Sequence, residues 1–274
     1  MKYKKLTVLL LLLALSLQLF ACAAAPAPTQ PQGSETPSQT DDPSDTPTSP
    51  TGYPAQPLGG EGESKEPDAA FAAASAEFAA NLLKHAADSG KNAVVSPYSV
   101  LIALAMTANG ASGETRTQME AVLGLSVAQL NAYLLACGQK NTNELNAANA
   151  IWLREDYPVS EDFLQCSRDY YGAEVTSAAF NSDTRDRIND WVNYQTRGMI
   201  EKILDDMDPD AVMYLVNALA FKASWKHEYT ESDVRPEVFH GASGDRQATL
   251  MYADESYYLH DENTAGFLKD YEND

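Results

Sequence analysis

The pattern of apolar and polar positions predicts that the first folded element is a helix. From residue 68 to 88 one apolar side chain recurs every three or four positions, which is the spacing of an amphipathic helix. The apolar face is formed by Phe71, Ala74, Phe78 and Leu82. The next apolar run, residues 92–95, is short and predicts a buried strand.

The following segment predicts a central helix. Ser96 is a good N-cap and Pro97 suits the first helical position, where its missing N–H has no cost. Residues 100–108 are apolar nearly all round, which predicts burial on every side. Asn109 and Gly110 then end the helix.

Further helices follow with recognisable ends. Ser112 begins a helix that runs through Leu123 to Gly124, and Ser126 with Gln129 forms a capping box before a helix to about Cys137. A further helix covers residues 160–171. The last begins at Asn181 or Ser182, ends near Gly198, and has a buried face made of Ile188, Trp191, Val192 and Gln195.

Strand patterns become more frequent toward the C-terminus. The residues 212–221 are apolar nearly throughout, which predicts a strand buried on both faces in the middle of a covered sheet. Helices dominate early and strands late, so the fold class is α+β with a large sheet. The other predicted strands cover residues 143–153, 173–180, 237–240 and 247–259.

The N-terminus has the features of an export signal. Lysines at the start precede an apolar stretch, residues 6–20, that is shorter than the roughly 20 residues of a membrane-spanning helix. Cys22 follows in a context that resembles a bacterial lipobox, so we expect residues 1–22 to be a lipoprotein signal and Cys22 to be lipidated. Ordinary cleavage after Ala21-Cys22-Ala23 is the alternative.

Residues 23–66 are rich in Pro, Thr, Ser, Gly and Asp and nearly free of large apolar side chains. Such a segment cannot bury enough surface to offset the entropy of ordering it. We therefore expect a disordered tether, followed by one domain over residues 67–274 that is large enough for a core.

Charge excludes one class of partner. The formal charge is −20, and without the three lysines of the signal the chain keeps 16 basic against 39 acidic residues. A surface this acidic repels phosphate backbones, so nucleic acid is not an expected partner. Because the acidic residues are spread along the chain, they favour solubility over an acidic docking patch.

The chain offers little catalytic chemistry. Its four histidines, at 85, 227, 240 and 260, lack the spacing of metal ligands, and no nucleophile or phosphate-binding motif occurs. Cys137 and Cys166 lack the spacing of a zinc site, and we expect two buried thiols, although sequence does not decide whether they pair. The sequence therefore predicts no metal, no cofactor and no enzyme activity.

Two polar features need a structural reason. Asn217 lies in the middle of the apolar run 212–221, where an amide without a partner costs a few kcal/mol, on the order of a lost hydrogen bond. Ser99 lies in the first turn of a buried helix, and capping explains Ser96 but not Ser99. We expect Asn217 to hydrogen-bond a specific partner.

Several blocks of the sequence resemble the serpin family. They occur in family order with natural spacing and extend over nearly all of residues 68–274. The blocks are NAVVSPYSVLIALAMTANGASGETRTQMEAVLG at 92–124, NDWVNYQTRGMIEKIL at 189–204, VNALAFKASW at 216–225, and residues 239–240 followed by 248–251.

The resemblance implies a protease inhibitor with a serpin fold, in which N-terminal helices pack on a large central sheet, sheet A. A protease of the serine or papain-like cysteine type cleaves a reactive-centre loop, which then inserts into sheet A as a new strand. We expect a monomer when complete, and the N-terminal signal predicts export to the cell surface or the extracellular space. The alternatives are a non-inhibitory serpin-fold binding protein and a solute-binding surface lipoprotein.

The resemblance further assigns candidate sites, each of which could instead serve fold maintenance alone. The polar cluster called the shutter would be Ser96, Ser99 and Asn217. The breach, where insertion begins, would include Lys222 and Trp225. Thr196 and Gly198 would form the exit of helix F.

The sequence stops at Asp274, before the family's last third and its reactive-centre loop. We therefore expect a fragment or truncated product in which the C-terminal part of the fold is missing. Open sheet edges would favour aggregation of this chain. No bait residue can be named.

Overall fold

The computed structural model describes residues 62–87, 91–140, 144–241, 243–262 and 264–272. The predicted signal, its lipidation residue Cys22 and the predicted tether up to residue 61 lie outside the described residues. All elements below belong to one compact unit.

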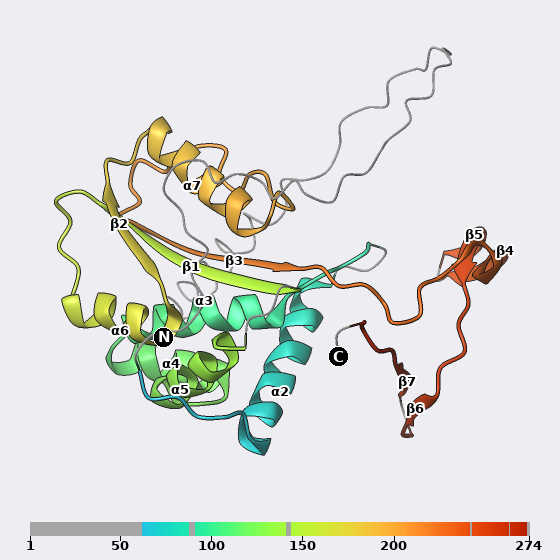
Figure 1. Ribbon diagram of the computed structural model, residues 1–274. Coiled ribbons are helices and arrows are strands. Elements are labelled where there is room, and N and C mark those ends of the chain that lie inside the picture. The colour runs from blue at the N-terminus through green and yellow to red at the C-terminus, as the bar shows by residue number, and fades with distance from the viewer. Residues whose placement is uncertain (1–61, 88–90, 141–143, 242, 263, 273–274) are drawn as a thin grey trace, which may run out of the picture. The chain divides into compact units, whose positions relative to one another are not determined.

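Six α-helices lie in the first part of the described chain (Figure 1). Five of them, α2 to α6, gather on one side of a sheet, and α7 lies on the other side. Their bounds are α2 Ala69–Ala86, α3 Pro97–Asn109, α4 Gly113–Leu123, α5 Val127–Gly138, α6 Glu161–Tyr171 and α7 Ser182–Gln195.

The predicted caps are confirmed. The Ser96 hydroxyl accepts from the Ser99 N–H, and Ser126 and Gln129 form the reciprocal capping box of α5. Asn181, one of the two candidates, caps α7 by accepting from Thr184 N–H. Gly124 ends α4 in the left-handed region at φ 77°, a conformation that favours glycine.

The sheet lies between α7 and the cluster of helices α2 to α6, and it has three described strands in the order β2-β1-β3. β1 (Leu145–Arg154) pairs in parallel with β2 (Glu174–Ala178) and antiparallel with β3 (Met213–Phe221), so the sheet is mixed. β1 is therefore the middle strand, and most of its residues are buried.

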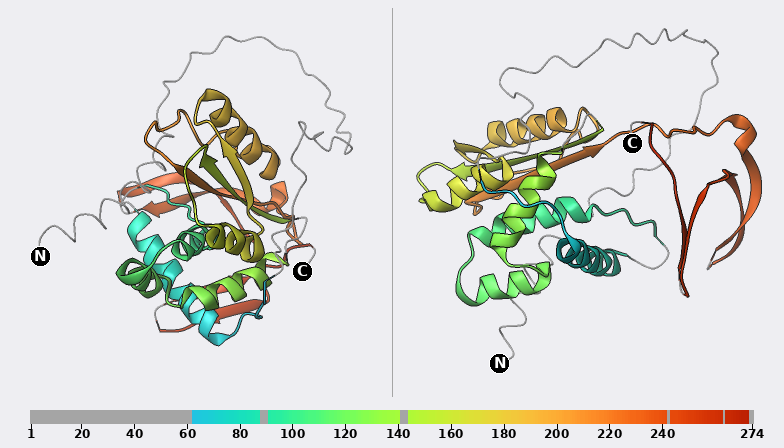
Figure 2. Two further views of the ribbon diagram at one scale, coloured as in Figure 1. Left: turned by 90° about the vertical axis from the view of Figure 1, so that its left-hand side faces the viewer. Right: turned by 60° about the horizontal axis from the view of Figure 1, so that its bottom comes forward.

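Alternation along β1 divides the core into two layers. Ala147, Ile151 and Leu153 face the helices α2 to α6 and join their apolar side chains. Ala148 and Trp152 face the other way and pack beneath Ile188 and Trp191 of α7. The additional views confirm that α7 and the helix cluster cover opposite faces of the sheet (Figure 2).

α3 is the central helix, as its all-round apolar sequence predicts. It packs against α2, α4, α5, α6 and β3. Its buried residues include Leu101, Ile102, Ala105 and Met106.

Two hairpins follow the sheet. A short 3₁₀ turn, η1 (Glu231–Asp233), leads into β4 (Val234–Gly241), which pairs antiparallel with β5 (Gly244–Met251). β6 (Tyr257–His260) pairs antiparallel with β7 (Ala265–Leu268). Many of their large apolar side chains are exposed, including Phe239, Met251, Tyr257, Tyr258, Leu259, Phe267 and Leu268.

The strand predicted over residues 92–95 is wrong. This segment forms no strand, and Val94 is 97% exposed. An apolar run becomes a strand only where another strand supplies hydrogen bonds, and in the described part of the chain no strand pairs with these residues. Apolar composition alone does not reveal that.

Two other strand predictions need correction. The run 212–221 forms β3 as expected, but β3 lies at the edge of the described sheet and not in its middle, because β1 occupies that place. The predicted strand 247–259 is split into β5 and β6 by the non-strand residues 252–256.

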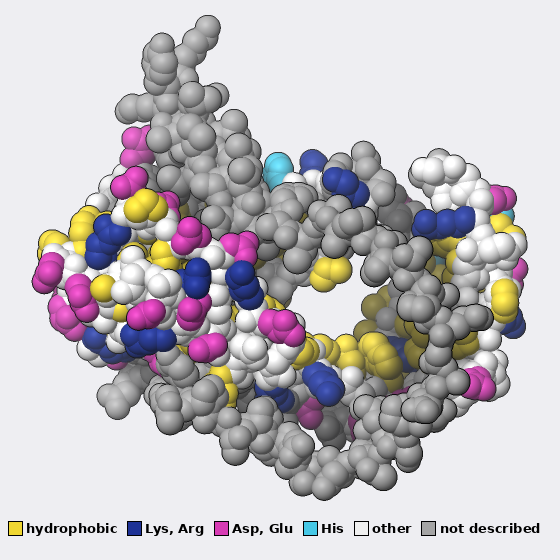
Figure 3. All heavy atoms as spheres, turned by 90° about the horizontal axis from the view of Figure 1, so that it is seen from above, with side chains coloured by type: hydrophobic (Ala, Val, Ile, Leu, Met, Phe, Trp, Pro, Cys, Tyr) yellow, Lys and Arg dark blue, Asp and Glu magenta, His cyan; other side chains and the backbone are white. Residues whose placement is uncertain are grey.

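The surface carries mixed charges. On the face seen in Figure 3, acidic side chains are interspersed with Lys and Arg and do not gather in one patch. All four histidines are exposed. Cys137 and Cys166 are unpaired and half-buried, less buried than expected, and burial raises the pKa of both thiols.

Among the described residues, no single helix has the length and apolar composition needed to cross a membrane; only α4 and α5 taken together, bent by 48° between them, meet that criterion.

Candidate functional site

A line of polar side chains crosses the sheet between β1 and β3. Asn149 and Asn217 stand opposite each other in the antiparallel register. Asn217 Nδ2 donates to Asn149 Oδ1 at 2.8 Å, and Asn149 Nδ2 donates to the Tyr171 carbonyl at 2.8 Å. Asn149 is only 2% exposed, so these bonds satisfy an amide that would otherwise be costly to bury.

The line continues into the central helix. The Ser99 hydroxyl, in the first turn of α3, donates to Asn217 Oδ1. Ser99 therefore joins the helix that lies at the centre of the fold to the edge strand of the sheet. We call Ser99, Asn217 and Asn149 the polar line.

The predicted shutter residues are brought together only in part. Ser99 and Asn217 are hydrogen-bonded partners. Ser96 forms no described hydrogen bond with Asn217; its hydroxyl accepts from the Ser99 N–H at 3.3 Å and serves the helix cap. Sequence reasoning missed Asn149, although it carries the same signal as Asn217, an amide within an apolar strand.

A second polar group extends the line into the helix cluster. The Tyr171 hydroxyl donates to Asn131 Oδ1 at 2.6 Å, and Asn131 Nδ2 donates to Asn109 Oδ1 at 2.9 Å. The Cys166 thiol lies 3.1 Å from the same Asn109 oxygen. Burial raises the pKa of Tyr171, so its hydroxyl remains a donor at any ordinary pH. Polar contacts thus run from β3 to α3, α5 and α6.

The end of α7 is held by side-chain hydrogen bonds. Thr196 is fully buried, its hydroxyl donates to the Val192 carbonyl at 2.8 Å, and it accepts from the Ile200 N–H at 3.0 Å. Gly198 has φ 80°, which reverses the chain after the helix. Asn189 accepts from both Ile203 and Leu204 N–H at 2.9 Å. The predicted exit residues therefore tie α7 to the segment that follows it.

The predicted breach residues lie just beyond β3. Trp225 stacks on Tyr271 with ring centroids 4.5 Å apart and an interplanar angle of 11°, and their backbones form an antiparallel bridge. Lys222 is exposed, and its backbone N–H donates to the Glu144 carbonyl at 2.8 Å. The structure does not bring the Lys222 side chain into a described hydrogen bond with Trp225.

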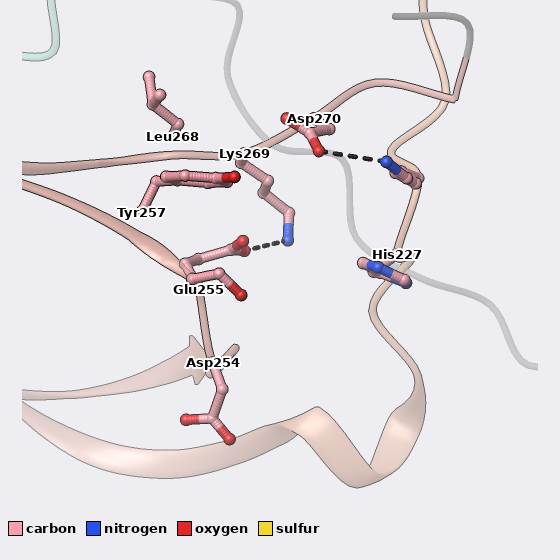
Figure 4. A pocket seen from close by; sticks show the side chains of 9 residues that line it. His227, Asp254, Glu255, Tyr257, Leu268, Lys269 and Asp270 are labelled. Carbon is pink, nitrogen blue, oxygen red and sulfur yellow. Dashed lines mark hydrogen bonds and ion pairs between the residues drawn. The ribbon is translucent and has the colours of Figure 1, made fainter.

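A charged pair beside Trp225 was not foreseen. Lys269 Nζ is 2.6 Å from Glu255 Oε1, and the two side chains are 10% and 18% exposed (Figure 4). The same ammonium lies 4.7 Å from the Tyr229 ring centroid and 5.6 Å from that of Trp225. The carboxylate raises the pKa of Lys269. Residues far apart in sequence form this cluster, so no local pattern could have found it.

A pocket is lined in part by this pair. Its walls mix acidic and basic side chains, and in Figure 4 Lys269 reaches Glu255 while Asp270 pairs with Lys226 at 3.3 Å. In the described part of the chain, no three His, Cys, Asp or Glu side chains gather as metal ligands. Two of the pocket's charged pairs, Lys269–Glu255 and Lys226–Asp270, are thus formed within its own lining.

The fold and the polar line together define an α+β protein in which a mixed sheet is buried between one helix and a helix cluster. The family model described as Serpin (serine protease inhibitor) matches residues 73–269. That match covers most of the chain, so the protein belongs to the serpin family. The prediction of a serpin fold, with helices packed on a mixed sheet, is confirmed.

Relatives support the same assignment. The chain is 32% identical to corticosteroid-binding globulin of Sus scrofa over 60% of this chain and 44% of that protein. It is 30% identical to plasminogen activator inhibitor 1 of Bos taurus over 75% of this chain and 54% of that protein. The native-state crystal structure of tengpin, a thermophilic serpin, aligns with TM-score 0.70 and 42% identity over 78% of this chain and 57% of that chain. The chain thus spans about half the length of the curated relatives it matches.

Proposed function

We propose that the chain is the N-terminal part of a serpin that inhibits serine or papain-like cysteine endopeptidases by inserting a reactive-centre loop beside β3. The observation that carries the proposal is the polar line beneath β3, a strand with one strand neighbour among the described residues. On this proposal the protein is an inhibitor and not an enzyme, and it needs no cofactor.

The position of β3 at the edge of the described sheet supports strand insertion. An edge strand presents N–H and C=O groups that a further strand can satisfy, and helices cover both faces of this sheet. Met213, Leu215 and Leu219 pack toward the helix cluster, whereas Val216 and Ala218 pack toward α7. An inserted strand would therefore gain backbone hydrogen bonds and apolar burial together.

The polar line supports a role as a latch. A satisfied buried polar network fixes one arrangement of the strands, and a polar group on an arriving strand could take the place of one of its partners. On the proposal, Ser99, Asn217 and Asn149 hold β3 in register until a further strand arrives. Trp225 with Tyr271 would mark the end where insertion begins, and Thr196 with Gly198 would anchor α7 over the sheet.

The test uses the longest natural form of the protein that carries a reactive-centre loop. We expect a denaturant-resistant covalent complex with at least one member of a panel of serine and papain-like cysteine proteases. Asn217→Ala should lower the fraction of protease trapped and raise the fraction of inhibitor merely cleaved. Gln118→Ala, on the exposed face of α4, is the matched control. Absence of a complex across the panel would refute inhibition.

A second candidate is a non-inhibitory serpin-fold binding protein. It is favoured by the likeness to corticosteroid-binding globulin, whose name describes binding and not inhibition. The hinge of the reactive-centre loop discriminates the two, because small residues there permit insertion and bulky or charged ones obstruct it. Cleavage of the loop without a gain in thermal stability would favour this candidate.

The location of the protein belongs to the same proposal. The sequence features of residues 1–22 support export, and Cys22 supports a lipid anchor. The predicted tether, residues 23–66, would hold the domain away from the membrane, except for its last residues, 62–66, which contact the helix cluster. Cells grown with a labelled fatty acid should yield labelled protein, and Cys22→Ser should abolish the label. Unlabelled wild-type protein in the culture medium would support ordinary signal cleavage instead.

A further inference from the structure

Residues 62–68, which we call the strap, lie against the helix cluster before α2 begins. Gly62 N–H donates to the Asp169 carbonyl of α6 at 3.1 Å, and Lys65 N–H donates to the Ala132 carbonyl of α5 at 3.0 Å. A Cβ at Gly62 would meet the Tyr170 ring at 2.6 Å, so the strap fits closely there. The strap is the blue segment that leads to α2 in Figure 1.

The side chain of Lys65 is engaged by the domain. Its Nζ donates to the Tyr133 hydroxyl at 2.7 Å and lies 2.9 Å from Asp68 Oδ2. Tyr133 is fully buried, and its hydroxyl donates to the same Asp68 oxygen at 2.7 Å. Asp68 also accepts from Phe71 N–H as the N-cap of α2. Lys65, Tyr133 and Asp68 therefore form a closed triad.

The titration of the triad agrees with this geometry. Hydrogen bonds to Tyr133 and Asp68 raise the pKa of Lys65, and the bond to Lys65 lowers the pKa of Asp68. Both groups thus stay charged across the neutral range. The triad is complete at the pH at which most extracellular proteases act.

The sequence gives Lys65 a special position. After the lysines at positions 2, 4 and 5, the chain contains no Lys or Arg until Lys65. A protease with an acidic primary pocket cuts after Lys or Arg. Between Cys22 and the domain, such a protease therefore meets its first cleavable bond at Lys65–Glu66, inside the strap.

We propose that the strap shields the Lys65–Glu66 bond from proteases that cut after basic residues, so that the chain between Cys22 and the domain offers them no cleavable bond. Proteolysis of a folded segment requires local opening that frees the backbone and the side chain. Here a backbone hydrogen bond holds Lys65 N–H, and the triad holds Nζ. The shielding itself does not depend on the proposed export; only the encounter with extracellular proteases does.

One contact near the strap is not expected to matter. Glu66 pairs with Lys140 at 2.5 Å, but the two side chains are 74% and 61% exposed. Surface ion pairs of this kind contribute little, because water and salt screen them. Lys65 and Asp68 are themselves 53% and 42% exposed, but both bind the hydroxyl of the fully buried Tyr133, which the Glu66–Lys140 pair does not. Lys140→Gln is therefore the matched control, because it removes this pair and leaves both residues of the Lys65–Glu66 bond unchanged.

Trypsin digestion of the full chain tests the proposal, with intact mass and N-terminal sequencing used to follow the Lys65–Glu66 bond. Leu58→Lys places a basic residue outside the strap, followed by Gly59. We expect the bond after position 58 to be cut in that variant under conditions that leave Lys65–Glu66 intact in the wild type. Equal cleavage rates at the two bonds would overturn the proposal.

Variants that loosen the strap give a second readout. Tyr133→Phe removes both hydroxyl hydrogen bonds but keeps the ring contact with Phe71, and Gly62→Ala obstructs the contact with Tyr170. Each should raise cleavage at Lys65–Glu66 about tenfold, since cleavage follows the population of the open form. Lys140→Gln should leave the rate within about twofold.

Cleavage in α7 separates strap opening from unfolding. Arg187 lies in α7, above the sheet, and trypsin should cut there only when the domain unfolds. A rise at Lys65–Glu66 with no rise at Arg187 supports the strap. No change at Lys65–Glu66 in either loosened variant, with Arg187 still protected, would refute it.

Discussion

Two regions of the molecule differ in how much of their apolar side chains is exposed. One is the three-stranded sheet with its helices, and the other is the pair of C-terminal hairpins. Ile151 of β1 and Ile102 of α3 are 0% and 2% exposed, whereas Tyr258 of β6 and Phe267 of β7 are 69% and 59% exposed. The first region encloses its apolar residues with its own elements. The hairpins have apolar side chains without such an enclosure among the described residues.

This difference in burial indicates which region contributes most to the free energy of unfolding. Burial of apolar area contributes about 25 cal/mol per Å², so the exposed side chains of β6 and β7 contribute little in this chain. We expect the helices and the three-stranded sheet to unfold as one unit and the hairpins to open independently.

The largest expected effect comes from deleting a core side chain in the enclosed region. Ile151→Ala should lower the free energy of unfolding by about 2–5 kcal/mol, because it leaves a cavity between β1 and the helix cluster. Leu259→Ala, in the exposed hairpin, should change it by less than about 0.5 kcal/mol. Urea unfolding followed by circular dichroism measures both, and similar losses would contradict the comparison.

The polar line should give the next effect. Asn149→Ala removes the partner of Asn217 Nδ2 and frees the Tyr171 carbonyl, so it should cost about 1–3 kcal/mol. Ser99→Ala should cost less, and the two losses should not add, because the residues share Asn217. A double-mutant cycle measures this coupling, and strict additivity would argue against one connected line.

Two glycines with positive φ provide a matched pair. Gly124 (φ 77°) ends α4, and a Cβ there would lie 3.0 Å from Ala74; Gly244 (φ 110°) begins β5, with open space around it. Gly124→Ala should lower the free energy of unfolding by about 1–2 kcal/mol. Gly244→Ala should leave the cooperative transition in place, because the hairpin lies outside it. A larger loss for Gly244→Ala would break the comparison.

The smallest expected effect is a pH dependence at Glu174. Burial beside α7 raises the pKa of this carboxyl, so the folded state holds its proton to higher pH than the unfolded chain does. Stability therefore falls as pH rises from the unfolded pKa through the folded one. Glu174→Gln should stabilise the protein more at pH 7 than at pH 4, as thermal unfolding at the two pH values would show. An equal effect at both would contradict it.

Local patterns predicted the enclosed region well. The caps at Ser96 and Ser126, the stop at Gly124 and the buried face of α7 follow from short-range rules that hold because the elements form there. Asn217 was expected to need a partner, since a buried amide must be satisfied wherever the fold places it.

The remaining features depend on distant residues. Whether residues 92–95 become a strand is decided by a neighbouring strand, and the order of β1 and β3 in the sheet is decided by pairing. Asn149 carried a usable signal that was overlooked, whereas Lys269 and Glu255 meet only through the fold. Periodicity reports which face of an element is apolar, and it does not report what covers that face.

Hydrogen exchange on the 274-residue chain tests the comparison most directly. The account predicts slow amide exchange in α3, β1 and β3, with opening free energies close to that of global unfolding, and fast exchange throughout β4 to β7. Exchange in the hairpins as slow as in β1, or fast exchange in β1 and β3 themselves, would contradict the account.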